Sequence, residues 1–188
     1  MRLFIAIELS DPVKDSLTQI QSHLKYAAAD VKWVERDNIH LTLKFLGEID
    51  EKKAAVISTI LDNIAKDFSP FEITIKDLGV FPKMDFPRVV WVGLEEKGAK
   101  IVEEIFKKIE ERLVELGFDK EARAFTSHIT IGRVRSPKNK EALKEKILSY
   151  DLSPTTKSPI SSIILFQSTL TPKGSIYTKL HEAQLCSA

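Results

Sequence analysis

Two histidine–threonine pairs have residue types and spacing that suit acid–base chemistry. His40 and Thr42 lie in the run His-Leu-Thr-Leu, and His128 and Thr130 lie in the run His-Ile-Thr-Ile, about half a chain further on. Alternate residues of a β-strand face the same side, so each histidine shares a face with its threonine. Two such strands facing one space would present two imidazoles and two hydroxyls together.

This set of groups suits cleavage of a phosphodiester. Attack at phosphorus needs a base for the nucleophile and an acid for the leaving oxygen, and histidine, with a pKa of about 6.5, can serve as either. Threonine hydroxyls can donate to the non-bridging oxygens, where negative charge develops. The chemistry needs no cofactor. We expect no metal site either, because zinc usually takes three or four ligands and threonine is a poor one.

Four further residues are candidates for contact with a substrate. Simple alternation places Lys44 beyond Thr42 on the histidine face and Phe45 on the opposite face with the leucines. Alternation also places Arg133 opposite the second histidine, unless Gly132 marks a β-bulge. Lys44 and Arg133 are candidates for phosphate contact, and an aromatic ring such as Phe45 or Tyr177 could stack on a base. Structural or surface roles are expected for the remaining candidates, which are His23, His181, Arg88 and Lys173.

Strands and helices alternate along the whole chain, which predicts an α+β or α/β fold. The four expected helices run from Asp11-Pro12, from Asp50, over 97–116 and from Ser136-Pro137. The expected strands cover 2–9, 32–35, 40–46, 71–77, 88–94, 128–134, 159–170 and 175–185, with a loop over 79–87. An amphipathic helix follows each histidine motif, so the motif copies at 40–43 and 128–131 indicate two related lobes. We expect a single domain over 1–188.

Composition and charge restrict the classes of function. The 188 residues include 28 basic and 27 acidic side chains, for a net charge of +1. This balance disfavours salt-driven coating of long nucleic acid but permits binding of an RNA end. The single cysteine, Cys186, forms no internal disulfide, which indicates a reducing compartment. With neither a signal-peptide core nor a membrane span in the sequence, we expect a cytoplasmic protein that is independent of membranes.

Five sequence blocks, in order, carry a resemblance to a known family. They are RLFIAIEL, NIHLTLKFLGEI, GVFPKMDFPRVVWVG, HITIGRVR and STLTPKGSIY. With the duplicated His-x-Thr motif they resemble the two-histidine phosphoesterase superfamily. More closely, the chain is similar to the RNA 2',3'-cyclic phosphodiesterases, which have also been labelled 2'-5' RNA ligases.

The resemblance implies an α+β fold with two pseudo-symmetric lobes of antiparallel sheet, helices outside and a central cleft. It implies hydrolysis of RNA 2',3'-cyclic phosphate ends to 2'-phosphomonoesters, with His40 as proton donor and His128 as acceptor. The expected partners are RNA ends or short oligonucleotides, bound by a monomer. Two alternatives remain open: a phosphodiesterase for 2'-5' linked oligonucleotides or small cyclic nucleotides, and a non-catalytic module that binds RNA ends.

Overall fold

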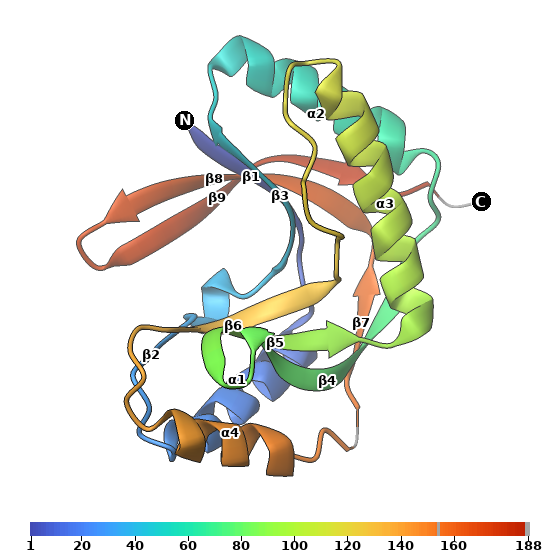
Figure 1. Ribbon diagram of the computed structural model, residues 1–188. Coiled ribbons are helices and arrows are strands. Elements are labelled where there is room, and N and C mark those ends of the chain that lie inside the picture. Colours follow the sequence, from blue (N-terminus) through green and yellow to red (C-terminus); the bar gives the residue numbers. More distant parts are fainter. Residues whose placement is uncertain (154, 187–188) are drawn as a thin grey trace.

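The computed structural model describes residues 1–153 and 155–186, which form two antiparallel sheets and four α-helices (Figure 1). The helices are α1 (Asp11–Lys25), α2 (Glu51–Ala65), α3 (Glu96–Val114) and α4 (Lys140–Ser149), with a short 3-10 helix at Arg36–Asn38. The strands are β1 (Arg2–Ile7), β2 (Val31–Trp33), β3 (Leu41–Glu48), β4 (Phe71–Lys83), β5 (Phe86–Leu94), β6 (His128–Val134), β7 (Lys157–Ile160), β8 (Ser162–Thr171) and β9 (Gly174–Gln184). The chain is therefore α+β, as expected.

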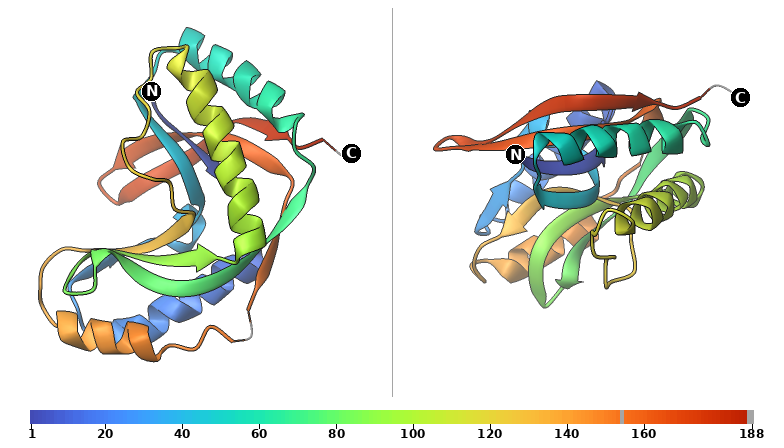
Figure 2. Two further views of the ribbon diagram at one scale, coloured as in Figure 1. Left: turned by 45° about the vertical axis from the view of Figure 1, so that its right-hand side comes forward. Right: turned by 90° about the horizontal axis from the view of Figure 1, so that it is seen from above.

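The two sheets contain two similar units of strand, helix, motif strand and helix. One sheet has the order β3-β1-β8-β9 and the other β2-β6-β5-β4-β7. In the first unit, β1 and α1 precede β3 and α2. In the second, β5 and α3 precede β6 and α4. Each motif strand pairs with the strand that opens its unit, β3 with β1 and β6 with β5. The sheets give the molecule a C-shaped outline in the left view of Figure 2.

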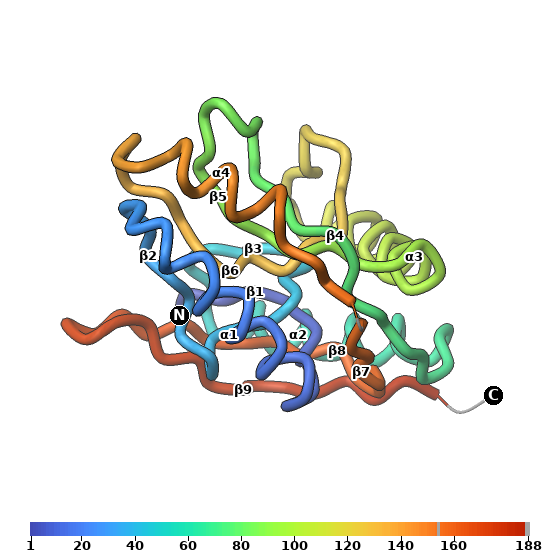
Figure 3. The backbone as a smooth tube through the Cα atoms, turned by 90° about the horizontal axis from the view of Figure 1, so that it is seen from below, coloured from blue at the N-terminus to red at the C-terminus, as the bar shows by residue number. Residues whose placement is uncertain are grey.

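The helices cover one side of each sheet. Helices α1 and α4 contact each other beside the five-stranded sheet, and Figure 3 shows the backbone from their side. Helix α2 contacts β8 and β9 of the other sheet and also contacts α3. Pro12 in the first turn of α1 fits a helix start, since an N–H there has no partner within the helix. No helix in the part of the chain that the structure describes is long and apolar enough to cross a bilayer.

Three expected boundaries were wrong. The loop expected at 79–87 is mostly the end of a hairpin, because β4 continues to Lys83 and β5 begins at Phe86. Helix α4 begins at Lys140, after Asn139 in a left-handed conformation, and not at Ser136-Pro137. The strand expected over 159–170 is two strands in different sheets, with β7 paired to β4 and β8 paired to β1 and β9.

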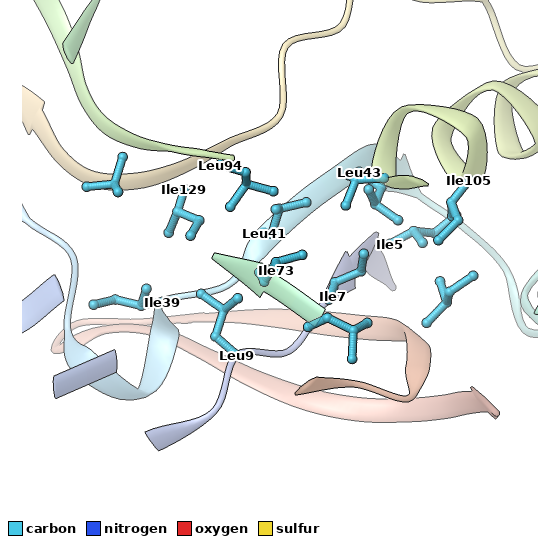
Figure 4. Packing of buried hydrophobic residues seen from close by; sticks show 14 of the residues in the cluster. Ile5, Ile7, Leu9, Ile39, Leu41, Leu43, Ile73, Leu94, Ile105 and Ile129 are labelled. Atoms are coloured by element: carbon cyan, nitrogen blue, oxygen red, sulfur yellow. The ribbon is translucent and has the colours of Figure 1, made fainter. Parts of the chain in front are cut away.

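Two groups of buried apolar side chains lie on opposite faces of the four-stranded sheet. The larger one is continuous through both sheets and all four helices, and Figure 4 shows Ile5 and Leu41 of one sheet near Ile73 and Ile129 of the other. The smaller group consists of Phe4, Ala6, Ile164 and Phe166, with Tyr177 packed against it. The first motif therefore lies on a sheet that packs on both faces.

Strand β3 contains a β-bulge directly after its His-x-Thr motif. Thr42 lies opposite Ala6 of β1 and Lys44 lies opposite Ile5, so Leu43 has no partner on the neighbouring strand. A bulge of this kind places two successive residues on the same side. Leu43 and Lys44 are accordingly both buried.

Strand β6 contains the same bulge at the same motif position. Thr130 lies opposite Trp91 of β5 and Gly132 lies opposite Val90, which leaves Ile131 without a partner. From the histidine onward, both strands then have the same burial pattern: half-buried, buried, half-buried, buried, buried, exposed. The two motifs are therefore equivalent over six residues, two more than the sequence repeat indicates.

The bulge in β3 overturns the expected orientation of two side chains. Lys44 does not lie on the histidine face but points into the core, where it is 5% exposed. Phe45 lies opposite Phe4 and shares its face, the one with the histidine, and not the face of Leu41 and Leu43. Alternation failed here because it assumes a strand without an extra residue.

Lys44 is held by a buried ion pair that ties β3 to α3. Its ammonium donates to the carboxylate of Glu110 and, over 3.0 Å, to the carbonyl of Asp119. The second carboxylate oxygen of Glu110 accepts from the backbone N–H of Glu121 at 2.7 Å. The pair thus also fixes the segment that leads from α3 to the second histidine motif.

Removing one partner of this ion pair should be costly. Lys44→Met leaves the Glu110 carboxylate buried without its cation, so we expect the free energy of unfolding to fall by about 3–5 kcal/mol in urea denaturation. Adding Glu110→Leu should recover part of this loss. As a control, Lys107→Met, which breaks an exposed pair with Glu103, should change stability by less than about 1 kcal/mol. A similarly small effect of Lys44→Met would contradict this role.

Candidate active site

His40 lies between the 3-10 helix and β3, on the face of the smaller apolar group. Its imidazole is half-buried and packs on the rings of Phe4, at 4.9 Å between centroids, and Tyr177, at 5.3 Å. The 3-10 helix before it is anchored to α1, since the Arg36 guanidinium donates to Asp11 at 2.9 Å and to Asp15 at 2.8 Å. The first histidine is therefore fixed from two sides.

Burial lowers the pKa of His40 to about 4. The largest cause is removal from water, which disfavours the charged imidazolium. The positive charge of Lys14 lowers the pKa further, whereas a hydrogen bond with the backbone of Asn38 raises it. In the free protein His40 is therefore neutral at pH 7.

His128 is the first residue of β6 and is oriented by its own backbone. Its Nδ1 lies 2.7 Å from the carbonyl oxygen of Thr126. A carbonyl only accepts, so this contact places the proton of the neutral ring on Nδ1 and leaves Nε2 as the acceptor. The equivalent bond of His40 also goes to the backbone two residues earlier, at Asn38. The two histidines thus share their local support as well as their motif.

Aromatic rings also support the second motif. The ring of Phe81 meets that of His128 edge-on, with 5.0 Å between centroids and an angle of 88°. Phe81 in turn stacks on Trp91 at 5.0 Å, and Trp91 lies opposite Thr130. Trp91 packs over Gly79, where an added Cβ would come within 2.5 Å of the indole ring. Glycine is therefore required at this position for the ring to lie flat on the sheet.

Strands β3 and β6 belong to different sheets but contact each other. The two histidine–threonine pairs therefore lie at the start of neighbouring strands. Thr42 and Thr130 are both half-buried and, from the register, face the same side of their strands as their histidines.

Arg133 lies on the histidine face of β6, which resolves the alternative left open by the sequence. It lies opposite Val89, two residues from Trp91 on β5, and Trp91 lies opposite Thr130. Partners across a ladder share a face, so the bulge returns Arg133 to the side of Thr130 and His128. Its side chain is exposed. Arg133 and Phe45 occupy equivalent positions after the two bulges.

Phe45 and Tyr177, the candidates for base stacking, both lie beside Phe4, and Tyr177 also packs on His40. Phe45 is 62% exposed, with its ring 6.0 Å from that of Phe4. Tyr177 meets the Phe4 ring edge-on at 4.9 Å. One motif strand thus offers an exposed aromatic ring where the other offers a guanidinium.

The remaining sequence candidates have the structural or surface positions expected of them. His23 packs against Tyr150 between α1 and the end of α4, at 5.0 Å between centroids, and the Nε2 of His181 lies 2.7 Å from Asp62 of α2. Arg88 and Lys173 are exposed. Among residues 1–153 and 155–186, no three His, Cys, Asp or Glu side chains are grouped as metal ligands would be.

Sequence reasoning missed two buried polar residues of α1 beside the motifs. Lys14 is 9% exposed and its charge acts on His40, and Gln21 is 3% exposed and donates to the carbonyl of Ile131 over 2.8 Å. Both fall on the apolar stripe of the helix. A polar residue within such a stripe was the signal that could have identified them, because a polar side chain buried in the protein needs a hydrogen-bond partner or has a functional role.

The comparison with protein families agrees with the internal repeat. The model described as LigT like Phosphoesterase matches the chain twice, over residues 7–91 and 92–177. The chain belongs to the LigT-like phosphoesterase family. The boundary between the two matches falls within β5, so each match includes one histidine motif.

Two named relatives match this chain over nearly their whole length. A protein of Methanocaldococcus jannaschii named RNA 2',3'-cyclic phosphodiesterase is 40% identical over 182 residues, which cover 97% of this chain and 99% of that protein. One of Thermotoga maritima with the same name is 35% identical, with coverages of 98% and 95%.

Solved structures share the fold of this LigT-like phosphoesterase. The protein TT0787 of Thermus thermophilus is 28% identical with a TM-score of 0.76, and the match covers 98% of each chain. E. coli LigT complexed with 3'-AMP has a TM-score of 0.78 at 23% identity, covering 99% of this chain and 98% of that one.

The lowered pKa of His40 predicts a specific dependence of stability on pH. Between pH 6.5 and 4 the unfolded chain binds a proton at residue 40 that the folded chain does not bind, so stability rises with pH in this range. The contribution is complete above about pH 6.5 and is lost as the pH falls toward 4, at up to about 3 kcal/mol.

In urea denaturation between pH 4.5 and 7, His40→Gln should flatten this dependence, whereas the control His181→Gln should leave the His40 contribution in place. A His40 imidazole that titrates near pH 6.5 in NMR spectra of the folded protein would contradict the prediction.

Proposed function

We propose that this chain hydrolyses 2',3'-cyclic phosphate ends of RNA to 2'-phosphomonoesters by acid–base catalysis with His40 and His128. One observation carries the proposal: two neighbouring strands present the same bulged His-x-Thr motif, each with its imidazole and hydroxyl on one face. Two relatives that match over nearly their whole length are named RNA 2',3'-cyclic phosphodiesterase, which supports the same substrate.

In the proposed reaction His128 accepts a proton from water through Nε2, and the water oxygen forms a new bond to phosphorus. The bond from phosphorus to the 3'-oxygen breaks, and His40 supplies the proton that this oxygen takes up. The product has a 2'-phosphate and a 3'-hydroxyl. The Nδ1 bond of His128 to Thr126 supports its role, because it leaves Nε2 unprotonated in the neutral ring.

His40 must gain its proton before it can donate one, since it is neutral in the free protein. The negative charge of a bound phosphodiester favours the imidazolium and so raises the pKa of His40. We propose that substrate binding charges His40, so that the acid forms only when its leaving group is present. The positive charge of Lys14 opposes protonation until that anion is bound.

In the proposed complex, some of the other groups on this face contact the phosphate and the rest contact the terminal base. The hydroxyls of Thr42 and Thr130 donate to the non-bridging oxygens, and the Arg133 guanidinium pairs with the phosphate. The exposed ring of Phe45, with Tyr177 beside His40, offers a stacking surface for the terminal base. Lys44 has no place in this proposal, because it is buried against Glu110.

The same site accounts for the ligase label. When a 5'-hydroxyl of another RNA end replaces water, the same proton transfers join the two ends through a 2'-5' phosphodiester. Water is far more concentrated than RNA ends, so hydrolysis is the favoured direction.

The first test is the reaction itself. The purified protein should open an oligonucleotide that ends in a 2',3'-cyclic phosphate, leave a 2'-phosphomonoester, and do so at the same rate with and without a strong chelator. Product ends can be identified by phosphatase treatment and mass spectrometry. Loss of activity on chelation would overturn the metal-free mechanism, and faster turnover of a cyclic mononucleotide or a 2'-5' linked dinucleotide would redirect the substrate assignment.

The second test separates the catalytic histidines from the others. His40→Ala and His128→Ala should each lower kcat by about 10²–10⁴-fold, the range expected when a positioned acid or base is lost. His181→Ala is the matched control, because His181 contacts Asp62 of α2 at 2.7 Å and takes no part in the proposed reaction. It should keep near-normal kcat. Retention of most activity by either site variant would show that its imidazole transfers no proton.

A further inference from the structure

Gln21 of α1 lies buried against the bulge of β6. Its Nε2 donates to two backbone carbonyls, those of Val34 and Ile131, each at 2.8 Å. The Ile131 carbonyl also accepts from the backbone N–H of Val34 at 3.0 Å. Ile131 is the residue that has no partner on β5. A side-chain amide of α1 therefore completes the hydrogen bonding at the point where the strand is irregular.

The bulge determines where Arg133 points. In a regular strand, residues 130 and 133 would face opposite sides, because their positions differ by an odd number. The extra residue at 131 brings Arg133 opposite Val89 and hence onto the face of Thr130. Close packing at Gly132 also restricts the strand, since an added Cβ would lie 2.8 Å from Val31 and 2.9 Å from Trp33.

We propose that Gln21 is a positioning residue for the phosphate site, which acts by holding the β6 bulge and thereby directing Arg133 toward the substrate. The inference rests on the proposed function, in which Arg133 pairs with the phosphate. Gln21 itself is on the far side of the strand from the substrate and touches none of the reacting atoms. Its effect on the reaction passes through the orientation of the guanidinium.

A double-mutant cycle tests this coupling. Gln21→Met keeps a similar length but removes both N–H donors, and it should lower kcat/KM on a cyclic-phosphate-ended oligonucleotide about tenfold when Arg133 is present. In an Arg133→Ala background the same change should lower kcat/KM less than about twofold. Gln19→Met, at an exposed position of the same helix, is the matched control and should have no effect in either background.

A purely structural role would give another pattern. An equal loss from Gln21→Met in both backgrounds, or no loss at all, would overturn the inference. The assays are run at a temperature at which circular dichroism shows every variant folded. If Gln21→Met does not fold, Gln21→Asn, which keeps an amide on a shorter side chain, takes its place in the same cycle and is judged by the same criterion.

Binding of inorganic phosphate gives a readout that is separate from turnover. Calorimetry on the same variants should show that Gln21→Met weakens phosphate binding only when Arg133 is present. A wild-type protein that binds phosphate with this coupling but opens no cyclic phosphate would contradict the proposed function alone. If the protein opens the cyclic phosphate but the effects of Gln21→Met and Arg133→Ala on phosphate binding are independent, the positioning role alone is contradicted.

Discussion

One extra residue directly after each His-x-Thr motif decides which side chains share the face of the histidine. The His-x-Thr sequence needs only a regular strand to place an imidazole and a hydroxyl on one face. The bulge that follows adds a third side chain to that face, Phe45 in one lobe and Arg133 in the other. It also turns the residue before this side chain into the core, Lys44 in β3 and Gly132 in β6. The two residues are accommodated there in different ways. Lys44 pairs with Glu110, and Gly132 packs under Trp33.

The two imidazoles share a motif but differ in environment. His40 is packed among Phe4, Phe166 and Tyr177 and has a lowered pKa because water is excluded from it. His128 packs against the ring of Phe81 and is oriented by the Thr126 carbonyl. In the proposed reaction the two imidazoles hold different protonation states, and unequal surroundings favour such a difference.

Sequence patterns predicted the parts of this structure that follow from regular periodicity. The duplicated motif, the alternating elements and the shared face of each histidine and threonine could all be inferred in this way. The orientations of Lys44 and Phe45 could not, because nothing in a Leu-Lys-Phe run marks an extra residue in the ladder. Gly132 gave a hint in the second copy only. Gln21 was hidden for another reason: its partners are backbone carbonyls distant in sequence, which leave no pattern in side-chain types.

The repeated unit of strand, helix, motif strand and helix has a consequence for how such a site can specialise. Two separate copies related by exact two-fold symmetry would present two identical imidazoles with identical proton affinities, and both would carry any substitution. Joining the copies in one chain removes that restriction, because each half can change alone. One half has a ring and the other a cation at the same structural position. The proposed site therefore has two unlike ends, and an RNA end bound there as proposed would have one polarity.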